Sequence, residues 1–122
     1  MRNQNTPTEI ALRTYQVGFG DCFLLSFRYP NDMRHVLIDF GSTGRVAKGP
    51  SMQAIADDVA KVTGGKLHVV VATHRHADHI SGFAGKPGDT IAALSPDAVL
   101  QPWTEHPHAA RDAKKAPRTR SL

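Results

Sequence analysis

The sequence predicts an α/β fold with a mixed β-sheet, and its elements follow the order β-β-β-α-β-α-α-β. Three short apolar stretches separated by turn residues open the chain, which indicates an antiparallel meander. A stretch with apolar residues at helical spacing follows them. The unbroken apolar run from Leu67 to Ala72 then predicts a central strand that is buried on both faces.

The three opening strands are separated by turns. Residues 9–17 alternate in part between apolar and polar side chains, which predicts a strand at an edge of the sheet or in a half-buried position. Two glycines in the next turn allow backbone conformations that are closed to other residues. Residues 22–29 form a more apolar second strand, residues 30–32 turn the chain, and residues 35–40 form the third strand.

One helix is predicted from residue 52 to about residue 63. Ser51 is a suitable N-cap, and the pair Gly64-Gly65 is typical of a helix C-terminus. Apolar residues at helical spacing give the helix one apolar face: Met52, Ile55, Ala56, Val59 and Val62.

Short elements are predicted after the central strand. We expect one helical turn over residues 80–84 and a loop over residues 85–88. Asp89 is then a suitable cap for a short helix over residues 90–94. Residues 98–101 form the last predicted strand.

The composition indicates one globular domain, because 40% of the 122 residues are hydrophobic and 21% are charged. We assign the domain to residues 9–104, after a disordered N-terminus over residues 1–8. Residues 105–122 form a basic, loosely ordered tail, which carries much of the formal net charge of +4. Such a tail can contact nucleic acid, but a solvated terminus is the simpler interpretation.

The single cysteine, Cys22, excludes an intrachain disulfide and suits a reducing compartment, and we expect it in the core. The N-terminal residues do not resemble a signal peptide, and no apolar run reaches the roughly 18 residues that span a bilayer. We therefore expect a soluble, cytoplasmic protein without a membrane partner.

Four potential metal ligands directly follow the central strand: His74, His76, Asp78 and His79. Alternate residues of an extended segment point to the same side, so the first two rings can lie together, and the other two side chains can face a second position. Imidazole and carboxylate are ligands that zinc accepts, and the carboxyl end of a buried strand is a common place for a site. Solvated surface histidines are the simpler alternative, but this spacing favours a metal site.

The segment HRHADH over residues 74–79 resembles the metal-binding signature of the metallo-β-lactamase superfamily. Residues 17–22 (VGFGDC) and 37–41 (LIDFG) are similar to the early strands of members related to the catalytic domain of DNA-uptake competence proteins. The resemblance covers about residues 10–103. It implies a four-layer αββα sandwich, of which this chain holds about one ββα half.

The resemblance implies a metal-dependent hydrolase, usually with two zinc ions; Mn²⁺ or Fe²⁺ are alternatives. His74 and His76 would bind the first metal ion, and Asp78 and His79 the second, with Asp78 assigned as the catalytic residue. Metal-activated water would attack an ester, amide, thioester or phosphodiester. Asp39 matches a family aspartate beneath the site and would orient a ligand by a hydrogen bond; a simple turn aspartate is the alternative.

The site implied by the resemblance also contains a histidine, a bridging aspartate and a final histidine from the second half of the sandwich. His106 and His108 come early for these positions, and we expect them to be either metal ligands or residues of a surface loop.

Three explanations of the half-domain stay open: the chain is part of a longer reading frame, it pairs with a second copy or another chain, or it is a non-catalytic zinc-binding or interaction module. The partners we expect are a small-molecule or phosphodiester substrate and, less directly, nucleic acid. A half-sandwich leaves an apolar sheet face bare, so we also expect poor solubility of the monomer.

Overall fold

The computed structural model describes residues 4–44, 47–102, 104 and 114, and the remaining residues are left out of the description below. The elements, in chain order, are β1 (Glu9–Thr14), β2 (Cys22–Tyr29), β3 (Asp32–Phe40), α1 (Met52–Thr63), β4 (Val69–Val71), α2 (Ala77–Ile80), η1 (Ser81–Phe83), α3 (Gly85–Ala92) and β5 (Ala98–Leu100). This order agrees with the predicted one.

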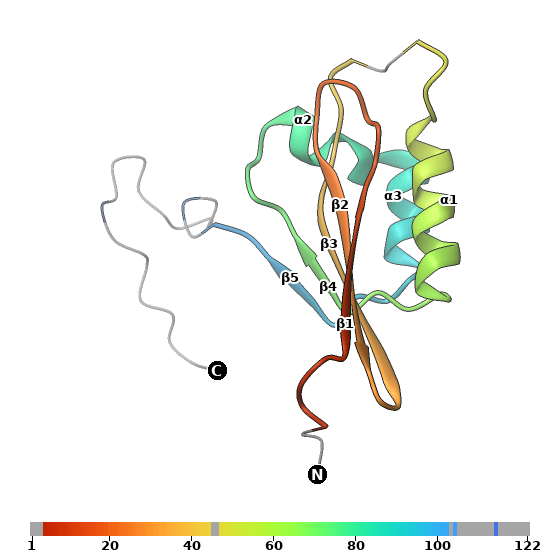
Figure 1. Cartoon of the computed structure of the whole chain (residues 1–122). Coiled ribbons are helices and arrows are strands. Elements are labelled where there is room, and N and C mark those ends of the chain that lie inside the picture. The colour runs from red at the N-terminus through yellow and green to blue at the C-terminus, as the bar shows by residue number, and fades with distance from the viewer. Residues whose placement is uncertain (1–3, 45–46, 103, 105–113, 115–122) are drawn as a thin grey trace.

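The five strands form one mixed sheet in the order β1-β2-β3-β4-β5. The first three strands are antiparallel neighbours, which confirms the predicted meander, whereas β3, β4 and β5 are parallel. A parallel pair requires a crossover connection, and α1 and α3 lie in these two crossovers. Both helices lie on the same side of the sheet (Figure 1).

The helix α1 has the caps that the sequence predicts. The Ser51 hydroxyl accepts a hydrogen bond from the Ala54 N–H group (3.1 Å), and Gly64 ends the helix in the left-handed region at φ 62°. The predicted apolar face is buried against the sheet through Ile55, Ala56 and Val59. Hydrophobic burial of this face therefore fixes α1 on the sheet.

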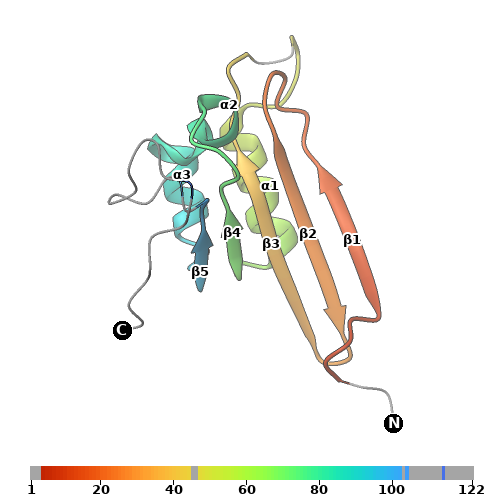
Figure 2. The ribbon, with the colours of Figure 1, turned by 90° about the vertical axis from the view of Figure 1, so that its left-hand side faces the viewer.

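No helix in the described part of the chain covers the opposite face of the sheet (Figure 2). This face is apolar: Phe23, Leu25 and Ile38 alternate with the buried residues of β2 and β3 and are only half-buried. Val70 points to the helices and is 5% exposed, whereas Val69 and Val71 point to the open face and are only half-buried. The expectation that the central strand is buried on both faces is therefore wrong for the described residues. On the edge strand β1, Ile10 and Leu12 are 59% and 62% exposed.

The helix α3 is the main difference from the predicted elements. It spans Gly85–Ala92, so the predicted loop is helical, and Asp89 lies inside the helix rather than at its N-cap. Gly88 is buried, and a Cβ atom there would lie 1.9 Å from the Phe83 carbonyl oxygen. Ile91 is buried in the core beside α1. Tertiary packing thus outweighs the low helix propensity of the glycines.

The helical turn predicted over residues 80–84 begins earlier, because α2 and η1 together span residues 77–83. The last two residues of the histidine motif, Asp78 and His79, are therefore helical and turn toward the sheet end. None of the helices that the structure describes has the length and apolar character needed to cross a membrane.

Candidate metal centre

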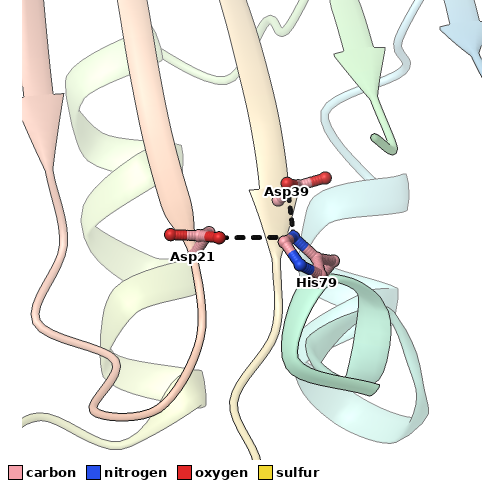
Figure 3. A group of neighbouring side chains, drawn as sticks. All are labelled: Asp21, Asp39 and His79. Atoms are coloured by element: carbon pink, nitrogen blue, oxygen red, sulfur yellow. Dashed lines mark hydrogen bonds and ion pairs between the residues drawn. The ribbon is translucent and has the colours of Figure 1, made fainter. Parts of the chain in front are cut away.

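The histidine motif lies at the carboxyl ends of the parallel strands β3 and β4, where α2 crosses the end of the sheet (Figure 1). The turn between β1 and β2 reaches the same end. Three segments that are far apart in the sequence therefore meet here, and Figure 3 shows one residue from each: Asp21, Asp39 and His79.

Asp39 occupies a left-handed backbone conformation (φ 57°) close to the end of β3. Such a conformation costs a non-glycine residue roughly 1–2 kcal/mol, although aspartate adopts it more readily than most residues. The Asp39 side chain is almost fully buried, because the residue is 2% exposed. A strained, buried carboxylate at a strand end is typical of a functional position.

The Asp39 carboxylate accepts three hydrogen bonds. Oδ1 accepts from the Thr73 N–H group (2.7 Å), and Oδ2 accepts from the Thr73 hydroxyl (2.5 Å). Oδ2 also lies 2.8 Å from Nδ1 of His79. These contacts satisfy the buried charge and connect β3 to the segment that follows β4.

His79 lies between carboxylates on both sides of its ring. Nδ1 faces Asp39 and also lies 3.3 Å from Oδ2 of Asp21, whereas Nε2 lies 3.5 Å from Oδ2 of Asp78 (Figure 3). The hydrogen bond that His79 donates to Asp39 raises the pKa of His79 above its ordinary value, the charges of the three nearby carboxylates add to this, and burial partly opposes it. In the neutral ring we assign the proton to Nδ1, which leaves the Nε2 lone pair toward Asp78.

The three histidine rings of the motif lie next to one another. The ring centroids of His74 and His79 are 4.7 Å apart, those of His74 and His76 are 5.8 Å apart, and those of His76 and His79 are 6.5 Å apart. His74 and His76 are exposed, whereas His79 is half-buried. With the Asp78 side chain, which is 42% exposed, they form an accessible cluster of nitrogen and oxygen donors. This donor set fits zinc.

Asp21 is a residue of the site to which the sequence analysis gave no role. Its N–H group donates to the Asp78 carbonyl oxygen (3.0 Å), and its own carbonyl oxygen accepts from the Gly41 N–H group (3.2 Å). Ligand atoms of Asp21, Asp39 and His79 lie within 4.8 Å of one another, so this group can also hold a metal ion. The sequence signals for Asp21 are its place directly after a glycine-containing turn and within the segment VGFGDC that carries the resemblance.

Two glycines allow the backbones to meet at the site. A Cβ atom on Gly41 would lie 2.5 Å from the Ile80 backbone nitrogen and 2.6 Å from the His79 carbonyl carbon. A Cβ atom on Gly20 would lie 2.7 Å from the Asp78 carbonyl oxygen. Both contacts are too close for any side chain, so glycine at these two positions lets α2 lie directly on the sheet end.

The other residues considered in the sequence analysis contribute less to this centre. Cys22 is 1% exposed, and burial together with the charge of Asp39 raises the pKa of its thiol to about 12. It is therefore a neutral core residue, as expected. His106 and His108 lie outside the residues that the structure describes.

Comparisons with known proteins agree with the predicted family. A family model described as the metallo-beta-lactamase superfamily matches residues 15–117, which is most of the chain. The comparisons with curated proteins and with solved structures found no match.

Proposed function

The chain belongs to the metallo-β-lactamase superfamily, and we propose on this basis that it is a metal-dependent hydrolase domain. The proposed metal ligands are His74, His76, Asp78 and His79. The single observation that carries the proposal is the position of the His79 ring, with Nδ1 bonded to Asp39 and Nε2 facing Asp78. A ring held in this way presents a lone pair for metal on the side of Asp78.

The proposed site uses the Nε2 side of His79 rather than the Nδ1 side. A nitrogen that donates its proton to Asp39 has no free lone pair for a metal ion. Asp39 and Asp21 are therefore proposed to orient and polarise the ring, whereas Asp78 lies on the ligand side. A site on the Nδ1 side, made of Asp21, Asp39 and His79, would require that proton to leave.

A bound zinc ion supplies Lewis-acid activation of water near neutral pH, and a complete site in this superfamily holds two ions; Mn²⁺ or Fe²⁺ would supply the same chemistry. The proposed role of the residues of this chain is to bind the metal ions and to orient the ligand side chains. Asp78 is the proposed catalytic residue, because its carboxylate is partly exposed and can accept a hydrogen bond from the attacking water. His106 and His108 remain proposed additional ligands.

The proposed substrates are esters, amides, thioesters or phosphodiesters. The similarity of residues 17–22 and 37–41 to the competence-related members favours a phosphodiester, in a small molecule or in nucleic acid, by analogy alone. A reducing, cytoplasmic location is proposed from the single buried cysteine.

A second candidate function is a non-catalytic zinc-binding or interaction module. It is favoured by the open sheet face, where Ile10, Leu12 and Leu100 are 54–62% exposed. An exposed apolar face of this kind is typical of an interface, either with a second copy of the chain or with the second half of the sandwich.

Elemental analysis combined with a hydrolysis assay separates the two candidates. The hydrolase is expected to hold nearly two zinc ions per chain and to cleave a generic phosphodiester or ester, with loss of both properties in His79→Ala. The module is expected to hold one zinc ion or none and to cleave nothing. A chain that binds no zinc at neutral pH would contradict the hydrolase and would leave only the interaction module.

A further inference from the structure

We propose that Thr73 is a positioning residue whose hydroxyl sets the ring tautomers of two histidines, His74 directly and His79 through Asp39. This inference rests on the proposed function, because the tautomer matters for metal binding only if these two rings are ligands. Thr73 follows β4 and directly precedes the histidine motif.

Thr73 engages both oxygen atoms of the buried Asp39 carboxylate. The Thr73 N–H group donates to Oδ1 at 2.7 Å, and the Thr73 hydroxyl donates to Oδ2 at 2.5 Å. A hydroxyl has one hydrogen atom, and an ionised carboxylate can only accept. The single hydrogen of the Thr73 hydroxyl is therefore committed to Asp39, and only its lone pairs remain for other partners.

The Nδ1 atom of His74 lies 3.0 Å from the Thr73 hydroxyl oxygen. Since that hydroxyl is already a donor to Asp39, a hydrogen bond at this distance requires Nδ1 of His74 to be the donor. A neutral imidazole that carries its proton on Nδ1 has its lone pair on Nε2. The position of one hydroxyl hydrogen thus decides which nitrogen of His74 is free.

The oxygen atoms of Asp39 and Thr73 also fix the tautomer of His79. Its Nδ1 lies 2.8 Å from Oδ2 of Asp39 and 3.5 Å from the Thr73 hydroxyl oxygen, and both of these oxygens are acceptors toward it. Asp39 can hold the His79 ring in this orientation because the two hydrogen bonds from Thr73 fix the Asp39 carboxylate. Both rings are therefore expected to have the Nδ1–H tautomer before any metal ion binds, with Nε2 ready as the ligand.

A purely structural role is the alternative, in which Thr73 only satisfies the buried charge of Asp39. Two variants separate these roles. Thr73→Val keeps the shape and the N–H bond to Oδ1 but removes the hydroxyl, whereas Thr73→Ser keeps the hydroxyl. A structural role predicts altered stability without a change of tautomer at His74.

The experiment is ¹⁵N NMR of the full metal-free chain with labelled imidazole nitrogens, at a pH where the rings are neutral. His74→Gln and His79→Gln identify the signals of each ring. Nδ1–H tautomers are expected at both rings in the wild type and in Thr73→Ser. In Thr73→Val, His74 is expected to shift toward the Nε2–H form, and zinc affinity measured by chelator competition is expected to fall about 10-fold or more.

An Nε2–H tautomer at His74 in the wild type would overturn the proposal, as would an unchanged His74 signal in folded Thr73→Val. If Thr73→Val fails to fold, the wild-type spectrum still tests the proposal, because an Nε2–H tautomer at His74 would overturn it. A wild-type chain with the expected tautomers that binds no zinc would refute the proposed function while leaving the role of Thr73 intact.

Discussion

The Nδ1 atom of His79 lies 2.8 Å from Oδ2 of Asp39, a carboxylate that is almost fully buried. The two residues are forty positions apart in the chain and meet where α2 lies on the end of β3. A buried carboxylate that accepts from one ring nitrogen determines the direction of the other nitrogen. We therefore expect metal binding at this centre to depend on Asp39, although Asp39 is not one of the proposed ligands.

Replacement of Asp39 by asparagine is expected to weaken zinc binding by about 10- to 100-fold, because a residue that orients a ligand has an effect of this size. The amide keeps the shape but loses the charge that holds the Nδ1 proton of His79. Chelator competition measures the affinity, and the exposed Asp89→Asn is the matched control.

Asp21→Asn is expected to have a smaller effect than Asp39→Asn, because Asp21 lies farther from the ring, at 3.3 Å. Complete loss of zinc in Asp21→Asn, as severe as in His79→Ala, would instead support a metal site on the Nδ1 side of the ring.

The assignment of ligands within the histidine motif predicts a contrast between two neighbouring residues. His76→Ala is expected to abolish binding of one metal ion, since it removes a nitrogen ligand, whereas Arg75→Ala is expected to change the zinc content little. Elemental analysis of the purified variants measures this contrast. Equal zinc content in the two variants would contradict the assignment.

Gly41→Ala is expected to disrupt the centre without replacing any ligand. The new methyl group would lie about 2.5 Å from the α2 backbone, so α2 must move away from the sheet end. Overpacking of this kind costs about 1–3 kcal/mol, and zinc affinity is expected to fall with it. Denaturant unfolding and chelator competition measure the two effects.

Gly44→Ala is the control for Gly41→Ala, because a Cβ atom there meets only the exposed Phe19 side chain, at 3.2 Å. If Gly41→Ala were as stable and bound zinc as tightly as this control, the close approach of α2 to the sheet would be wrong.

The pH dependence of stability is expected to reflect His35, which is 4% exposed and bonded to Ser26 at 2.7 Å. Burial lowers the pKa of His35 below its ordinary value of 6.5, and the nearby His68 adds to this. The unfolded chain therefore takes up this proton at a higher pH than the folded chain. The free energy of unfolding is expected to decrease as pH falls from 6.5 through the lowered pKa of His35.

In the metal-free chain, His79 contributes the opposite slope. Its pKa is raised in the folded state, so its contribution is complete below 6.5 and is lost as pH rises through the raised value. His35→Asn separates the contributions of the two histidines, because it removes only the decrease in the free energy of unfolding that His35 causes below pH 6.5. Denaturant unfolding on either side of pH 6.5 measures the slopes, and an unchanged slope in His35→Asn would exclude His35 as the cause.

The open sheet face is expected to cause self-association of the isolated chain. The double variant Ile10→Glu, Leu12→Glu places two charges on the exposed edge strand and is expected to shift the chain toward a soluble monomer. Lys86→Glu is the matched control, because it changes the net charge by the same amount on the exposed surface of α3. Sedimentation measures the oligomeric state, and a monodisperse wild-type monomer that melts cooperatively would contradict this expectation.

Local patterns in the sequence predict the order of elements, the caps of α1 and the meander, because each depends on neighbouring residues. Asp39 and the histidine motif were also found as candidates, the former from the family resemblance and its place at a strand end, the latter because it directly follows an apolar strand. Asp21 and Thr73 were not, since their roles depend on contacts between segments that are distant in the sequence. The first half of α3 was predicted as a loop for a similar reason: its glycines disfavour a helix locally, and packing against Phe83 and α1 accounts for it.

The parallel pairing of β3 with β4 has a consequence for how the protein matures. Asp39 and Thr73 come together only when the chain closes the long connection through α1, so we expect the centre to be completed late in folding. An ion that binds the completed centre but not the unfolded chain stabilises the native state by mass action. Zinc supplied during refolding, rather than afterwards, is therefore expected to raise the yield of native protein.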